Sequence, residues 1–113
     1  MPSTTTYKRG QVVVVTVPFT SQEGSKLRPA VVVSSEKFHR RLRDVILCPI
    51  SSQPRYFEKP GPGDRPISKW KAVGLHFPST VRVFNILAVE KTLIRRALGK
   101  LMDSPFDLCF RPK

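Results

Sequence analysis

Cysteine is nearly absent from this chain, and what is missing excludes several classes of protein. Cys48 and Cys109 are the only two cysteines among 113 residues, too few for a scaffold built on disulfides. Cys48 lies in the apolar run VILCPI, which favours a small buried hydrophobic residue. No stretch approaches the roughly 20 apolar residues that a membrane span needs. Residues 1–10 lack the basic-then-apolar order of a signal peptide, so a cytoplasmic protein is expected.

Motifs for metals and nucleotide cofactors are missing as well. No spacing of Cys and His resembles a zinc site, and no Walker or Rossmann glycine pattern occurs. We therefore expect neither a metal nor another cofactor. With 40% apolar residues and a length suited to one core, residues 1–113 are expected to form a single domain.

Acidic residues are scarce, and this imbalance of charge is the most informative feature of the composition. Twenty Lys and Arg stand against eight Asp and Glu, which gives a net charge of +12. Such an excess favours a polyanionic partner. The basic residues are spread over many segments and form no basic amphipathic helix. Nucleic acid is therefore favoured over a membrane surface.

Short Val-rich runs dominate the rest of the chain and predict a mainly β protein with short helices. We expect strands at 11–19, 29–34 and 44–50, further short strands within 65–77 and 79–89, a helical turn at 36–43, and a helix at 90–101. A hairpin-length loop at 20–28 and a long Pro- and Gly-containing loop at 51–66 separate them. Many short strands with little helix predict a small, strongly bent sheet, closer to a barrel than to a helix-covered parallel sheet.

Several of these segments, in this order, resemble the MazF/PemK/Kid toxins. The segments are KRGQVVVVTVPFT, KLRPAVVVSS, VILCPISSQ, WKAVGLHFPSTVR and LGKL, which together extend to about residue 101. The resemblance implies an SH3-like small β-barrel, the MazF/PemK/CcdB-like fold, and a homodimer. It also implies the toxin of a toxin–antitoxin pair: an endoribonuclease that cuts single-stranded RNA at short sequences without a metal ion and is held inactive by an antitoxin. The 12 residues from Met102, interrupted by Pro105, are too short for the longer C-terminal helix common in this family.

The same resemblance assigns three candidate catalytic residues. The family's essential Arg matches Arg28, its essential Thr falls on Ser51, and a loop Glu of some members falls on Glu23. Arg28 is suited to neutralise a phosphate because its guanidinium stays charged and presents paired donors. Ser51 can donate to a nonbridging oxygen, and Glu23 is a possible general base. The alternatives are a strand-end Arg, a turn-forming Ser and a solvated Glu.

The long loop and the segment 36–43 supply candidates for RNA binding. Single-stranded RNA binders stack bases on aromatic rings while cations follow the phosphates. The candidates are Lys26, Gln53, Arg55, Tyr56, Phe57, Lys59, Arg65, His39, Arg40 and Arg41. For the aromatic residues, the alternative is that one folds back onto the sheet. His76 is a further acid/base candidate, and Trp70 is expected to pack in the core or at its rim.

The sequence therefore predicts a sequence-selective endoribonuclease toxin. Its expected partners are single-stranded RNA, an acidic antitoxin protein and a second copy of the chain, with no membrane. Two alternatives remain. One is a noncatalytic protein of the same fold that binds a protein target such as gyrase. The other is a nucleic-acid-binding regulator. The pair Arg28 and Ser51 favours the enzyme, because a binding module does not require both.

Overall fold

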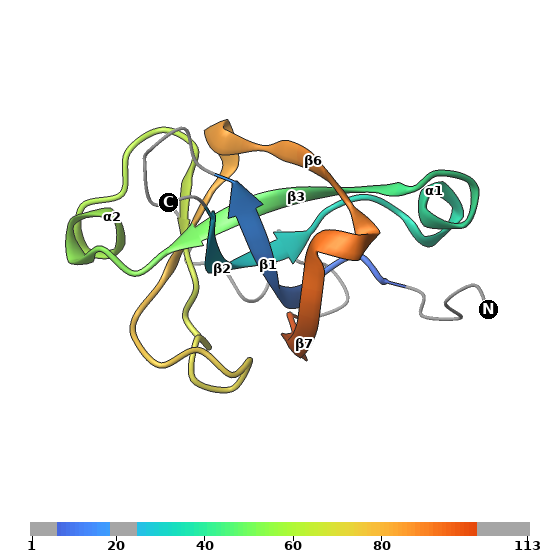
Figure 1. Cartoon of the computed structure of the whole chain (residues 1–113). Coiled ribbons are helices and arrows are strands. Elements are labelled where there is room, and N and C mark those ends of the chain that lie inside the picture. The colour runs from blue at the N-terminus through green and yellow to red at the C-terminus, as the bar shows by residue number, and fades with distance from the viewer. Residues whose placement is uncertain (1–6, 19–24, 102–113) are drawn as a thin grey trace.

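The computed structural model describes residues 7–18 and 25–101 as one strongly bent antiparallel sheet with short helices at its ends (Figure 1). The strands are β1 (Gln11–Pro18), β2 (Ser25–Val32), β3 (Asp44–Ser51), β4 (Asp64–Pro66), β5 (Thr80–Arg82), β6 (Leu87–Glu90) and β7 (Ile94–Lys100). The helices are α1 (Glu36–Arg41), α2 (Pro54–Glu58) and the short 3-10 turns η1 (Val83–Asn85) and η2 (Lys91–Leu93). The predicted mainly β class with short helices is confirmed.

β3 is the central strand of the sheet. The order β4-β5-β3-β2-β1-β7 places β2 on one side of it, while β5 and β6 share the other. β6 pairs with its first half, from Asp44 to Leu47, and β5 pairs with its end at Ile50 and Ser51. α1 and α2 lie at opposite ends of β3 (Figure 1), so residues on the two helices are separated by the full length of this strand.

The central strands are buried on both faces, which explains their continuous apolar runs. One cluster contains Val12, Val31 and Cys48, and the other contains Val13, Val32 and Leu47. Alternate residues of each strand therefore enter different clusters. Cys48 is buried as predicted, and burial raises the pKa of its thiol. Trp70 packs at the rim of the first cluster, also as predicted.

The helix predicted at 90–101 is wrong, because this segment forms η2 and the strand β7. β7 pairs with β1, but the register shifts twice, between Val12 and Val13 and again between Val14 and Val15. Each shift inserts an extra residue into β7, Leu98 in the first case and Arg95 in the second. A bulge of this kind reverses the face on which the following side chains lie. The apolar residues of 90–101 therefore lose the two-residue period of a strand and imitate a helical pattern.

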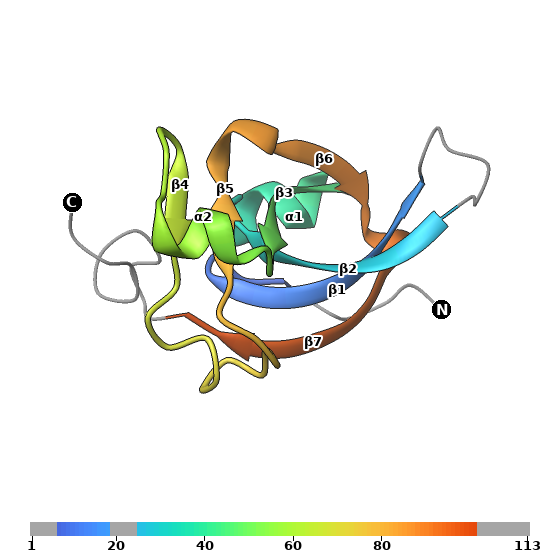
Figure 2. The same cartoon turned by 90° about the vertical axis from the view of Figure 1, so that its left-hand side faces the viewer.

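The expected small, strongly bent sheet of the SH3-like type is confirmed, but its described strands do not close into a barrel. β4 and β7 are the two ends of the strand order and do not pair with each other, so in the described part of the chain the bent sheet stays open (Figure 2). The long loop expected at 51–66 contains α2 and begins β4, and most of 65–77 forms turns in place of strands. Pro at the first turn explains how α2 begins in such a loop. The strands expected at 11–19, 29–34 and 44–50 and the helical turn at 36–43 are confirmed apart from their exact ends.

His39, a candidate for RNA binding, is instead an interior residue. Its side chain is 1% exposed. Nδ1 lies 2.5 Å from the carbonyl oxygen of Tyr7 and therefore donates to it, and Nε2 lies 2.5 Å from Oγ of Ser34. Oγ of Ser34 also accepts the backbone N–H of Ile46 at 3.0 Å. The imidazole thus ties the segment before β1 to α1 and β3, and it does not reach a surface ligand.

Burial lowers the pKa of His39 below its usual value, and the positive charges of Lys91 and Arg9 act in the same direction. The hydrogen bond to the Tyr7 carbonyl and the charge of Glu36 oppose this shift. The folded protein therefore favours the neutral imidazole more strongly than the unfolded chain does. The unfolded chain takes up a proton once the pH falls below about 6.5.

We expect the free energy of unfolding to be highest above pH 6.5 and to decrease as the pH falls through 6.5 toward the lower pKa of the folded state. Chemical denaturation between pH 5 and 8 measures this slope. His39→Asn should be less stable and should lose the part of the slope that lies near pH 6. His76→Asn is the matched control, since His76 is the other of two histidines and is exposed. An unchanged slope in His39→Asn would contradict this assignment.

Candidate functional site

Arg28 and Ser51 lie opposite each other on neighbouring strands. In the β2–β3 ladder, Ala30 pairs with Pro49 and Val32 with Leu47. Continued by two residues, this register puts Arg28 across from Ser51, on the same face of the sheet. Arg28 is exposed and Ser51 is half-exposed. The two residues that the resemblance singled out, 23 positions apart in the chain, therefore converge.

Both residues line one open pocket of about 470 Å³, which we call the Arg28 pocket. Its other lining residues are Pro29, Pro49, Ile50, Ser52, Gln53, Tyr56, Arg82, Asn85 and Leu87. Oγ of Ser51 accepts the backbone N–H of Gln53 at 3.2 Å. This bond orients the hydroxyl and leaves its own proton to be donated. A guanidinium and an oriented hydroxyl on one wall match the donors that a phosphate group accepts.

Tyr56 and Arg82, which also line the pocket, belong to a cluster of charged and aromatic side chains. Cζ of Arg82 lies 3.7 Å from the ring centroid of Tyr56, and Cζ of Arg55 lies 4.8 Å from it. Arg55 also donates to the phenol oxygen of Tyr56 at 2.8 Å. Nε of Arg82 lies 2.6 Å from Oδ1 of Asp64, an ion pair rather than a directed hydrogen bond, since this N–H has no well-aligned acceptor. The ion pair holds Arg82 over the ring.

These contacts favour the ionised form of Tyr56. The hydrogen bond from Arg55 lowers the pKa of the phenol below its usual value, and Arg82 acts in the same direction through its own hydrogen bonding and charge. Arg82 also covers one face of the ring, so this face is not open to a base. A base stacked on Tyr56 would compete with the two guanidinium groups over its ring, and the predicted stacking stays a prediction.

The structure brings only some of the predicted residues to this pocket. Gln53 and Tyr56 line it, and Arg55 contacts Tyr56. Lys26 is exposed on the same face of β2 as Arg28. Phe57 lies in α2, Lys59 directly follows this helix, and Arg65 lies in β4. Arg40 and Arg41 are exposed on α1, at the far end of β3 (Figure 1), so a strand bound at Ser51 would need to cross the sheet to meet them. Glu23 lies outside the described residues.

Sequence reasoning missed Arg82 and Asn85, two lining residues of the pocket. Arg82 was part of the segment WKAVGLHFPSTVR that carried the resemblance, but an Arg at the end of a short strand has no distinctive local pattern. The available signal was that Arg82 is an isolated charge in the largely apolar stretch 79–89, with Phe84 and Asn85 soon after it. Only the pairing of β5 with β3, at Thr80 and Ser51, brings this segment to the site.

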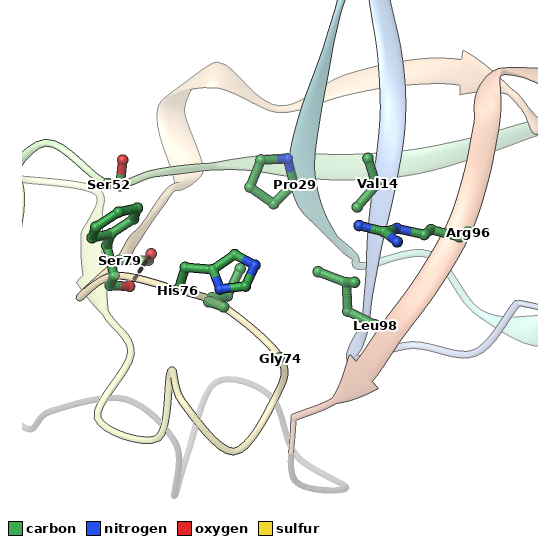
Figure 3. A pocket seen from close by; sticks show the side chains of 10 residues that line it. Val14, Pro29, Ser52, Gly74, His76, Ser79, Arg96 and Leu98 are labelled. Atoms are coloured by element: carbon green, nitrogen blue, oxygen red, sulfur yellow. Dashed lines mark hydrogen bonds between the residues drawn. The ribbon is translucent and has the colours of Figure 1, made fainter.

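A second, smaller hollow of about 240 Å³ adjoins the first and shares Pro29 and Ser52 with it. Val14, Leu75 and Leu98 form its apolar part, while His76 and Arg96 point toward each other across it (Figure 3). Oγ of Ser79 donates to the carbonyl oxygen of Phe77 at 2.7 Å and holds the turn that carries His76. His76 belongs to this hollow and does not line the Arg28 pocket.

No helix within residues 7–18 and 25–101 is long and apolar enough to cross a membrane. No group of three His, Cys, Asp or Glu residues in the same ranges is placed to hold a metal ion.

The chain is thus a small, mainly β protein: an open, bent antiparallel sheet with a basic pocket at one end of its central strand. The sequence profile of the PemK-like, MazF-like toxins of type II toxin–antitoxin systems matches residues 8–110. The chain therefore belongs to this family of toxins. No curated protein sequence matches it significantly.

Solved structures support the same fold. The complex MazE–MazF (Form-III) of Deinococcus radiodurans is similar with a TM-score of 0.64 and 19% identity, over 88% of this chain and 85% of that one. An endoribonuclease in complex with its cognate antitoxin from a mycobacterial species gives 0.62 and 19%, over 88% and 81%. The toxin MazF-mt6 of Mycobacterium tuberculosis gives 0.59 and 23%, over 82% and 83%. At these identities the likeness concerns the fold.

Proposed function

We propose that this toxin is a sequence-selective endoribonuclease that cuts single-stranded RNA, and that the Arg28 pocket is its active site. The observation that supports this most directly is the convergence of Arg28 and Ser51 on one pocket. One of the similar structures is itself described as an endoribonuclease. A cytoplasmic location follows from an RNA substrate and stays a prediction.

The geometry suits cleavage by attack of the 2′-OH on the neighbouring phosphorus. In this reaction negative charge builds up on the nonbridging oxygens as the fifth bond to phosphorus forms. The paired N–H groups of Arg28 can hold two such oxygens, and the hydroxyl of Ser51 can donate to one of them. Because Arg28 stays protonated, it stabilises charge and does not act as a free base. The products are a 2′,3′-cyclic phosphate and a 5′-hydroxyl.

RNA on either side of the scissile bond would meet further cationic groups. Arg82 lines the Arg28 pocket, and Arg55 contacts Tyr56 at its edge. Arg96 and His76 lie beyond Pro29 in the second hollow. Phosphate contacts of this kind give affinity with little sequence information. The side-chain amides of Gln53 and Asn85 in the pocket are the groups able to recognise base edges.

We expect cleavage of a long single-stranded RNA to proceed in EDTA and to leave 2′,3′-cyclic phosphate or 3′-phosphate ends. The reason is that the groups proposed for the reaction are an Arg and a hydroxyl, which need no metal to act on the phosphate. Sequencing of the cut ends and their sensitivity to phosphatase measure this outcome. If EDTA abolished the activity and Mg²⁺ restored it, the mechanism would be wrong. Tight RNA binding without any product would favour the nucleic-acid-binding regulator.

Replacing Arg28 by Ala should lower kcat by at least about 10²-fold, the order expected for loss of a main transition-state donor. Ser51→Ala should cost less, and Ser51→Thr should be tolerated because the hydroxyl is kept. Single-turnover rates on one RNA measure these effects. Arg40→Ala is the matched control, since it removes the same charge from α1 at the far end of β3. Near wild-type rates in Arg28→Ala would refute the site assignment.

The proposed partners are an acidic antitoxin and a second copy of the chain. A segment that covers the Arg28 pocket would meet its cations together with apolar side chains: Leu87 lines the pocket, and its chain neighbour Ile86 is 53% exposed. Such a segment would gain from charge and from apolar burial at the same site. A second copy would place two Arg28 pockets around one larger cleft.

Light scattering at tens of micromolar tests both partners in one series. We expect the mass of a dimer for the protein alone, and displacement of a noncleavable RNA when an acidic antitoxin encoded beside this gene is added.

The salt dependence of the two affinities should differ. RNA affinity should fall with salt at a slope near −0.7 per neutralised phosphate, and antitoxin affinity should fall less steeply because part of that binding is apolar. A monomer at all concentrations would refute the predicted dimer. A stable complex that contains both RNA and antitoxin would refute the prediction that they share one site.

A further inference from the structure

Tyr56 stands where a proton donor for the leaving group would be needed. It is the third residue of α2, and the short connection Ser52–Gln53 joins this helix to Ser51 at the end of β3. Its side chain lines the Arg28 pocket together with Arg28 and Ser51. If Arg28 and Ser51 hold the nonbridging oxygens, the bridging oxygens of the same phosphate face the remaining walls of the pocket, to which Tyr56 belongs.

The contacts of the phenol leave its proton available. Arg55 donates to the phenol oxygen at 2.8 Å, and Arg82 lies on the ring face at 3.7 Å. A guanidinium has no acceptor, so neither Arg can take the O–H proton. The phenol can therefore donate to a group in the pocket, whereas a role as base would first require it to lose this proton.

The charged groups around the phenol stabilise the anion that remains after donation. Arg55 and Arg82 approach it directly, and Arg28 lines the same pocket. Asp64, whose side chain is 7% exposed, is paired with Arg82 and offsets part of this positive charge. Glu58 is exposed two residues further along α2. The pKa of Tyr56 is lowered as a result, mainly by the hydrogen bond from Arg55.

We propose that Tyr56 is the general acid of the RNA cleavage reaction, with Arg55 and Arg82 as positioning residues; this inference rests on the proposed endoribonuclease function. As O2′ forms its bond to phosphorus, the bond from phosphorus to O5′ breaks. The phenol proton passes to O5′ and gives the 5′-hydroxyl product, and the electron pair of the O–H bond stays on the phenolate. The proton of the 2′-OH leaves to solvent. The phenolate then regains a proton from water.

The test compares two substrates in single-turnover reactions: an ordinary RNA, and the same RNA with sulfur in place of O5′ at the cut. A thiolate leaves without protonation, so it needs no general acid. Tyr56→Phe keeps the ring under Arg82 and removes only the hydroxyl. We expect its rate to fall by roughly 10²-fold or more on the ordinary RNA, and to match the wild-type protein on the sulfur substrate. Arg28→Ala should be slow on both substrates, which makes it the matched control.

The pH profile supplies a readout that a merely structural role of Tyr56 would not change. A general acid works while it is protonated, so the wild-type rate should fall as the pH rises through the lowered pKa of Tyr56. Arg55→Gln should move this fall to higher pH, and Tyr56→Phe should lose it. A Tyr56→Phe defect that persists on the sulfur substrate, or no defect on the ordinary RNA, would overturn the inference. If the wild-type protein cut neither substrate, the proposed function itself would fail.

Discussion

Ala30, Val31 and Val32 of β2 face Pro49, Cys48 and Leu47 of β3, and the site depends on this register. Burial on both faces specifies it, because a slip of one residue would move every side chain to the opposite cluster. Two residues beyond this buried part of the ladder, the same register sets Arg28 across from Ser51. The apolar segment is therefore the rigid support for a polar pair that has little packing of its own.

Tyr56 and Arg82 complete the pocket from segments that the central ladder does not contain. α2 follows β3 directly, and β5 returns to pair with the end of β3, so both arrive beside Ser51. The ion pair between Arg82 and the nearly buried Asp64 links β5 to β4 and holds the guanidinium over the phenol ring. Positive charges that would otherwise repel one another are thus fixed at one end of the sheet, where an anion would relieve the repulsion.

Much of the fold followed from short-range patterns. The Val-rich runs predicted β1, β2 and β3, and the polar segment 36–43 predicted α1. The pattern failed at 90–101, because two bulges against β1 displaced the apolar residues of β7 from strand periodicity to a helix-like one. It also failed for His39, whose polar neighbours in sequence indicated a surface residue. The carbonyl of Tyr7 and the hydroxyl of Ser34 satisfy its ring in the interior.

The amino-acid sequence alone determined the family, the excess of positive charge and the candidate pair Arg28 and Ser51, because motifs and composition are properties of the chain itself. The tertiary structure decided which cations meet in one place. Arg82 and Asp64 lie far along the chain from Arg28, and only strand pairing around β3 brings these segments together. The same pairing separates Arg40 and Arg41 from the pocket, although they lie nearer to Ser51 in sequence than Arg82 does. Residues that are close in sequence lie along the same strand or loop. The register of antiparallel pairing decides which strand ends come together in one pocket.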